Sequence, residues 1–228
     1  MRRQEAARRP HPLQGKGRLL DGLQRERVVL ARLRSDADLV IDTTNLNVHE
    51  LTDRIAEAFI RSHEGATPSF KGLYGFPKTL CTSINQEIVH GIPSKKRVLR
   101  EGNLVSVDVG VHFEGLHADS ATTIGVGEIS PEAERLLDVT QASLVAGIAA
   151  ARVGNHVGDI GHAVQTVAEG AGFGVVRELV GHGIGARFHE EPQVPNYGVP
   201  KRGPRLLEGM TIAIEPMIQK ANGRELVV

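Results

Sequence analysis

The stretch from Val105 to Ala121 constrains the fold more than any other part of this 228-residue chain. Its first half, VSVDVGV, alternates strictly between valine and a small or acidic residue. This period of two predicts a β-strand that buries the valines and turns Asp108 toward solvent or a polar cleft. Glu114-Gly115 then offers a turn, and a second aspartate, Asp119, follows among small residues.

A hairpin over this stretch would bring Asp108 and Asp119 to one side of a sheet. Carboxylates held that close repel each other unless a proton or a cation lies between them. The alternative is a pair of solvated aspartates near a turn, and these two residues alone do not exclude it. The other polar motifs of the chain have to decide.

The composition, 40% hydrophobic and 24% charged, is typical of a soluble globular protein. No run approaches the roughly 18 to 20 apolar residues of a membrane helix, and MRRQEAARRP lacks the apolar core of a secretory signal. The one cysteine, Cys81, excludes an internal disulfide framework. A cytoplasmic protein is therefore expected, with no membrane or DNA partner.

The charge is unevenly distributed. Residues 1–34 hold ten Lys and Arg against three Asp and Glu, a balance of +7, and the remainder holds 17 against 24, a balance of −7. Such a basic head could contact RNA or an acidic partner. A solvated segment without a partner explains the same composition, and we prefer it to RNA contact.

Elsewhere the pattern predicts an α+β domain. Turn and strand signals fill residues 65–91, and strands are expected at about 175–180 and 210–217. Ser130-Pro131 is a helix start, and a second helix is expected around Ile160 to Ala168. The first of these helices is expected to bury Leu136, Leu137, Leu144, Val145 and Ile148.

Four further polar residues lie beside glycine, proline or an apolar strand. They are His90, His182, His189 and Glu215. Any one of them alone is more often a satisfied polar residue than a ligand. Combined with the two aspartates, they form the mixed carboxylate and imidazole set that suits Mn, Fe(II), Co or Zn.

From about residue 50 to residue 228 the chain resembles type I methionine aminopeptidase, which has the pita-bread metallopeptidase fold. The resemblance rests on PSFKGLYGFP, TSINQEIVHGIPS, VSVDVGV, HADSATT, GHGIGARFHEEPQVPNYG and LLEGMTIAIEPMI. It implies that the protein removes the initiator methionine from nascent proteins in the cytoplasm, near the ribosome. It also implies two divalent metal ions, with Asp108 on one, Asp119 bridging both, and His182 and Glu215 on the other.

The resemblance also implies a mechanism. The metals would lower the pKa of a bridging water, and Glu215 would shuttle its proton. His90 and His189 would contact the substrate, with His189 stabilising the oxyanion. An apolar pocket would hold the methionine side chain, and its members would be Phe70, Phe76, Cys81 and Phe188. For Phe70 and Cys81, ordinary core packing is an equally good explanation.

Two departures from the family pattern bear on activity. The family has a fifth ligand, a glutamate in a strand after the IEPM motif, and Glu225 lies too soon and in a different motif to be that residue. The expectation is one tighter metal site, a weak or empty partner site, reduced activity and a sheet that is incomplete at its C-terminal end. Leu73 also stands where the family usually has tyrosine.

Residues 1–46 resemble a fragment of the RapZ-type nucleotide-binding (RNase adapter) family, through RRPHPL and ADLVIDTTNLNVHEL. No G-x-x-x-x-G-K-[ST] loop occurs, so phosphate binding is not expected. A helix with a capping box at Asn47 and Glu50 is the predicted seam to a catalytic domain over 47–228. The working hypothesis for this junction is a chimera or a mis-joined reading. For the function, the alternatives to the aminopeptidase are a metal-poor remnant that only binds peptides and an RNA-binding or nucleotide-linked adapter.

Overall fold

A computed structural model describes residue 54 and residues 65–221. The chain divides into two compact units, residues 1–42 and residues 43–228, and all described residues belong to the second. The basic segment over 1–46 and the helix start at Asn47 therefore lie outside the described residues. None of the described helices is long and apolar enough to cross a membrane.

The described part is α+β, as expected, and every strand pairing in it is antiparallel. Its strands are β1 (Thr67–Pro68), β2 (Cys81–Ile84), β3 (Leu104–Phe113), β4 (Leu116–Gly125), β5 (Phe173–Val175), β6 (Gly181–Gly183), β7 (Glu190–Val194), β8 (Ile212–Ala213) and β9 (Ile218–Lys220). Its helices are the 3-10 turn η1 (Leu73–Gly75), α4 (Pro131–Ala150) and α5 (Val157–Gly170).

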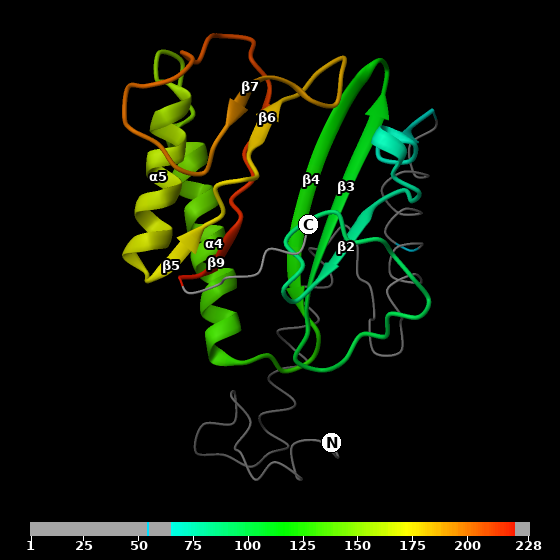
Figure 1. Cartoon of the computed structure of the whole chain (residues 1–228). Coiled ribbons are helices and arrows are strands. Elements are labelled where there is room, and N and C mark those ends of the chain that lie inside the picture. The colour runs from blue at the N-terminus through cyan, green and yellow to red at the C-terminus, as the bar shows by residue number, and fades with distance from the viewer. Residues whose placement is uncertain (1–53, 55–64, 222–228) are drawn as a thin grey trace, which may run out of the picture. The chain divides into compact units, whose positions relative to one another are not determined.

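The predicted hairpin is present as β3 and β4 (Figure 1). Strand β3 also pairs with β1 and β2. The turn residues Glu114 and Gly115 both have positive φ, at 50° and 84°, which favours the tight right-handed twist of a two-residue hairpin. Asp119 lies opposite Gly110, two residues from Asp108. Because side chains two apart share a face, both aspartates lie on one side of the sheet.

Helix α4 begins as predicted, and of the five residues expected inside three are half-buried, Leu136, Leu137 and Leu144, while two are exposed. Ser130 accepts a hydrogen bond from the backbone N–H of Ala133 at 3.2 Å and caps the first turn. Val145 and Ile148, expected inside, are 57% and 56% exposed, whereas Gly147 is buried. The reason is close packing on α5, since a Cβ at Gly147 would lie 2.9 Å from Cγ2 of Val164.

Helix α5 agrees with its prediction and buries Ile160, Val164 and Ala168. Its N-terminus is closed by a capping box between His156 and Asp159. Figure 1 shows α4 and α5 side by side on one flank of the fold, with the β3–β4 hairpin on the other and β6 between them.

The last two predicted strands were placed wrongly in detail. Of residues 175–180 only Val175 is in a strand, β5, and β6 begins after them at Gly181, because the chain bends where Arg177 N–H donates to the Glu178 carboxylate at 3.1 Å. Residues 210–217 contribute only Ile212–Ala213, as β8. Strand β6 lies between β7 and β8, and His182 pairs with Gln193 on one side and Ala213 on the other.

Candidate metal centre

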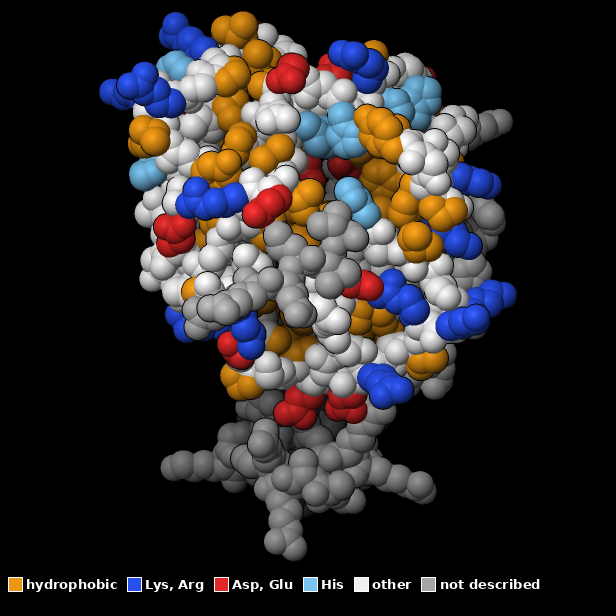
Figure 2. Space-filling view, viewed as in Figure 1, with side chains coloured by type: hydrophobic (Ala, Val, Ile, Leu, Met, Phe, Trp, Pro, Cys, Tyr) orange, Lys and Arg blue, Asp and Glu red, His pale blue; other side chains and the backbone are white. Residues whose placement is uncertain are grey.

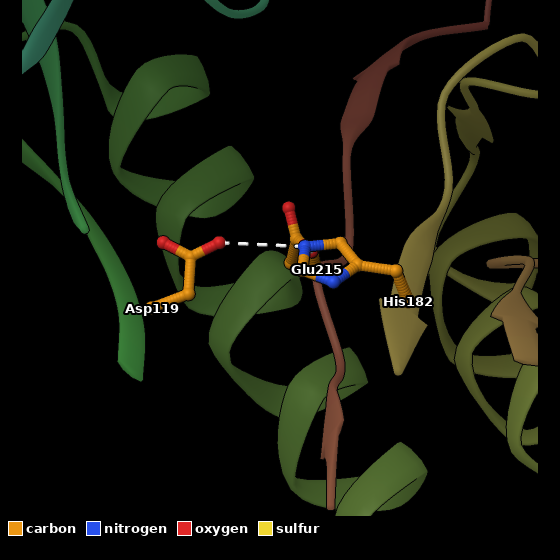
Figure 3. Close-up of side chains that lie close together, drawn as sticks. All are labelled: Asp119, His182 and Glu215. Atoms are coloured by element: carbon orange, nitrogen blue, oxygen red, sulfur yellow. Dashed lines mark ion pairs between the residues drawn. The ribbon is translucent and has the colours of Figure 1, made fainter. Parts of the chain in front are cut away.

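Three predicted ligands converge from three elements. Asp119 comes from β4, His182 from β6 and Glu215 from the segment after β8, and one ligand atom from each lies within 4.8 Å of the others (Figure 3). Nε2 of His182 is 3.5 Å from Oδ2 of Asp119 and 3.3 Å from Oε1 of Glu215. It is the one group of three such residues among those that the structure describes.

The backbone of β6 sets the orientation of His182. Its Nδ1 donates to the carbonyl oxygen of Gly183 at 2.8 Å, so Nε2 faces the two carboxylates. Burial by itself lowers the pKa of His182, but the contacts with Asp119 and Gly183 and the charge of Glu215 outweigh burial and raise it. An imidazole oriented in this way is typical of a metal ligand.

Two carboxylate oxygens of the group lack a donor. Oδ1 of Asp119 and Oε1 of Glu215 are buried and have no hydrogen-bond partner, although 32% of the Glu215 side chain remains exposed. Buried carboxylate oxygens without donors are costly, and a divalent cation is the partner that satisfies them. The residues therefore fit the metal ion that the sequence predicted.

Asp108 lies beside this group but is not one of its three members. Burial, the charge of Asp119, a hydrogen bond with Asp119 and the charge of Glu215 raise the pKa of Asp108 to about 8. Burial and then the charge of Asp119 raise the pKa of Glu215 to about 7. A negative site of this kind holds protons near neutral pH unless a cation replaces them.

The metal group lies in the wall of a pocket of about 880 Å³. The four residues predicted for the methionine pocket all line it, namely Phe70, Phe76, Cys81 and Phe188. His90 and His189 line the same pocket. Phe70, Cys81, Phe188 and Ile184 also form one buried apolar cluster. Figure 2 shows a hollow in this face where acidic side chains lie beneath histidine and apolar side chains.

Cys81 lines the pocket but does not act as a nucleophile. Burial, followed by the charges of Asp108 and Asp119, raises the pKa of its thiol to about 12. The thiolate, which is the reactive form, is therefore absent at neutral pH.

The two other predicted histidines, His90 and His189, also line the pocket. His90 has a φ of 58°, and a Cβ at the adjacent Gly91 would lie 2.2 Å from the Thr82 carbonyl oxygen. The ring of His189 lies 4.4 Å from that of His182, edge to face. Burial and then the positive charge of His182 lower the pKa of His189, so its imidazole is neutral at neutral pH.

Tyr74 is a pocket residue that the sequence did not predict. Its ring stacks on His189, with centroids 5.8 Å apart and planes at 17°, although the side chain is 86% exposed. Its φ of 49° is unusual for tyrosine and is flanked by positive φ at Gly72 and Gly75. The glycine spacing in KGLYG was the available signal for such a turn. Glu225 and the expectations attached to it lie outside the described residues.

The family match and the most similar relatives of this chain indicate the same family. The chain matches metallopeptidase family M24 over residues 28–228. It is 54% identical over 166 residues to a methionine aminopeptidase of Clostridium acetobutylicum, which covers 73% of this chain and 66% of that protein. It is 46% identical over 208 residues to methionine aminopeptidase 1 of Mycobacterium tuberculosis, covering 88% of this chain and 76% of the relative.

Solved structures confirm the predicted pita-bread fold. A methionine aminopeptidase from Thermotoga maritima superposes with a TM-score of 0.76 at 41% identity, covering 80% of this chain and 72% of that one. The corresponding enzyme of Rickettsia prowazekii gives a TM-score of 0.74 at 40% identity, covering 78% and 71%.

The chain spans 66% to 68% of the length of the two clostridial relatives. The family match begins at residue 28, inside the segment that resembles the RapZ-type family, and gives that resemblance no support. The ligands, the pocket, the fold and the sequence relationships agree. This chain belongs to metallopeptidase family M24 and, within it, to the methionine aminopeptidases.

Proposed function

We propose that this chain removes the N-terminal methionine from nascent proteins in the cytoplasm, with divalent metal ions as cofactors. The observation that carries the proposal is the group of Asp119, His182 and Glu215, in which two buried carboxylate oxygens have no hydrogen-bond partner, in the wall of a largely apolar pocket. An aminopeptidase needs this combination, because the metal acts at the peptide bond while the pocket holds the first side chain.

The group of three residues supports the proposed ligand assignment. Asp119, His182 and Glu215 would hold one cation, and Asp108 with Asp119 would hold a second. The cations would polarise the scissile carbonyl and lower the pKa of a water molecule. Their charge would also lower the pKa values of Asp108 and Glu215, so that both carboxyls are ionised in the loaded site.

The remaining residues have roles that match their surroundings. Glu215 would accept a proton at the group of three ligands. His189, neutral and held edge to face on His182, can donate a hydrogen bond to the oxyanion as the carbonyl becomes tetrahedral. His90 lines the same pocket and would contact the substrate backbone.

The pocket accounts for the choice of side chain. Phe70 meets Phe76 and Phe188 edge to face, at centroid distances of 6.4 Å and 5.2 Å. These rings and the protonated Cys81 thiol present an apolar, polarisable surface that suits an unbranched thioether. A charged first residue would lose its hydration there without gaining a partner.

Cleavage of a Met-Ala-Ser peptide during titration with Mn(II), Co(II) or Fe(II) tests the proposal. Turnover should require the metal and fall at least about 100-fold in Asp119→Asn. The matched control is Asp138→Asn, which removes an exposed carboxylate of α4 and should change nothing. Absence of cleavage with every metal would reject the proposed activity.

Peptide binding separates this proposal from a remnant that only binds peptides. The enzyme account predicts that Asp119→Ala loses metal and turnover together, whereas a peptide-binding remnant would keep its affinity and never show turnover. RNA contact by residues 1–46 stays a separate alternative, and nucleotide binding is not expected without a P-loop. Salt-dependent RNA binding by the full chain, absent after its basic residues in 1–34 are neutralised, would support the electrostatic version.

A further inference from the structure

A second pair of histidines lies at the turn end of the β3–β4 hairpin, outside the pocket. His112 of β3 and His117 of β4 are directly opposite each other in the strand register. Their ring centroids are 4.6 Å apart and the planes are tilted by 43°. Neither residue lines the pocket that holds the metal group, and both are partly exposed.

We propose that His112 and His117 form a second metal site, which takes a zinc, nickel or copper(II) ion between the two imidazoles. Two imidazoles that share a zinc ion at the usual Zn–N distance of about 2.1 Å have ring centroids about 5 Å apart. The observed 4.6 Å is close to this value, so a small ring rotation is sufficient.

The surroundings of His117 support the assignment. The Ser69 hydroxyl lies 2.8 Å from Nδ1 of His117, which fixes the ring and leaves Nε2 free. Ser69 is itself held in place, because its backbone N–H donates to the Gly110 carbonyl at 2.9 Å. A second hydrogen bond that orients the ring is a regular feature of histidine ligands.

The pair of His112 and His117 does not depend on the peptidase activity, so this metal site can be tested independently of the proposed function.

The ligand chemistry limits the metal. Imidazole pairs prefer Zn, Ni and Cu(II), whereas Mg and Mn prefer oxygen ligands. Among the described residues no third side chain joins the pair within ligand distance. Oε1 of Glu190 is engaged by the Arg187 backbone N–H at 2.8 Å. Water would therefore complete the coordination, and the site should be weaker than the three-ligand group.

Equilibrium dialysis of the full chain against Ni(II) tests the proposal. The wild-type protein should bind one more equivalent than His112→Asn, and the matched control His162→Asn, which removes an exposed imidazole from α5, should bind as many as the wild type. Equal stoichiometry in the wild type and His112→Asn would overturn the site. Mn(II) should show no difference between these two proteins, and an equivalent of Mn(II) lost in His112→Asn would contradict an imidazole site.

Two further measurements keep the result unambiguous. His117→Asn should also lose the extra equivalent of Ni(II). Because His117 packs on Phe188 with ring centroids 5.7 Å apart, His117→Asn could misfold, and the result from His112→Asn then decides. Sedimentation velocity should give the same monomer or oligomer with and without Ni(II). An extra equivalent that appears only as two copies associate would contradict a site within one hairpin.

Discussion

At the scale of single residues, Asp119 connects the parts of the candidate metal centre. It shares a hydrogen bond with Asp108 on the same face of the hairpin and lies 3.5 Å from His182 of β6. Its second oxygen is buried without a donor. One residue therefore joins the hairpin to the β6–β8 sheet, and a cation would stabilise the junction.

The pH dependence of stability follows from the carboxyl groups. The pKa values of Asp108 and Glu215 in the folded protein, about 8 and about 7, lie above their ordinary values. The stability that their protons contribute is complete below those ordinary values and is lost as the pH rises through about 7 to 8. The raised pKa of His182 acts in the same direction.

In EDTA, the melting temperature should consequently fall by about 5 °C between about pH 5 and about pH 8.5. Differential scanning calorimetry provides the measurement. Asp108→Asn should flatten the dependence, and saturating Mn(II) should reverse it because the metal replaces the protons. A melting temperature that rises over this range in EDTA would show that these pKa assignments are wrong.

Tyr74 provides a test of the pocket mouth. Its hydroxyl lies 3.5 Å from Nδ1 of His189, which is long for a hydrogen bond, whereas the two rings are stacked. We therefore expect Tyr74→Phe to match the wild type and Tyr74→Ala to lower kcat/KM for Met-Ala-Ser about fivefold to tenfold, which corresponds to one aromatic contact. Equal losses in both variants would assign the effect to the hydroxyl.

At the scale of elements, the hairpin was predictable and the helix contacts were not. The alternation in VSVDVGV predicts both the strand and the face that it buries, because in a strand every second side chain lies on the same face. The buried side of α4 depends instead on how closely α5 approaches Gly147, which involves residues far apart in sequence. Tyr74 was missed for a related reason, because an exposed aromatic in a turn has no periodic pattern.

Helix α5 offers a paired test of such close approach. A Cβ at Gly161 would lie 2.3 Å from the Tyr197 carbonyl oxygen, whereas nothing lies within 4 Å of a Cβ at Gly170 in the same helix. Gly161→Ala should lower the free energy of unfolding by about 2 to 4 kcal/mol, and Gly170→Ala should change it by less than about 1 kcal/mol. Urea denaturation would measure both.

At the scale of the whole molecule, the site combines segments that lie far apart in the sequence. The ligands Asp119, His182 and Glu215 come from elements spread over almost 100 residues, and spacing alone could not show that they meet. Resemblance of the surrounding motifs to a known family supplied that prediction, and the structure brings the three residues together. The same resemblance assigned Asp108 to the other metal ion, and the structure likewise leaves Asp108 out of the group of three.

Anomalous diffraction from a crystal of the full chain soaked in Co(II) would show whether the three residues hold a metal ion. We expect a cobalt peak at bonding distance, about 2.0 to 2.2 Å, from Asp119, His182 and Glu215, and a weaker neighbouring peak beside Asp108. Soaked crystals that show no peak at these residues, or cobalt only at other positions, would contradict it.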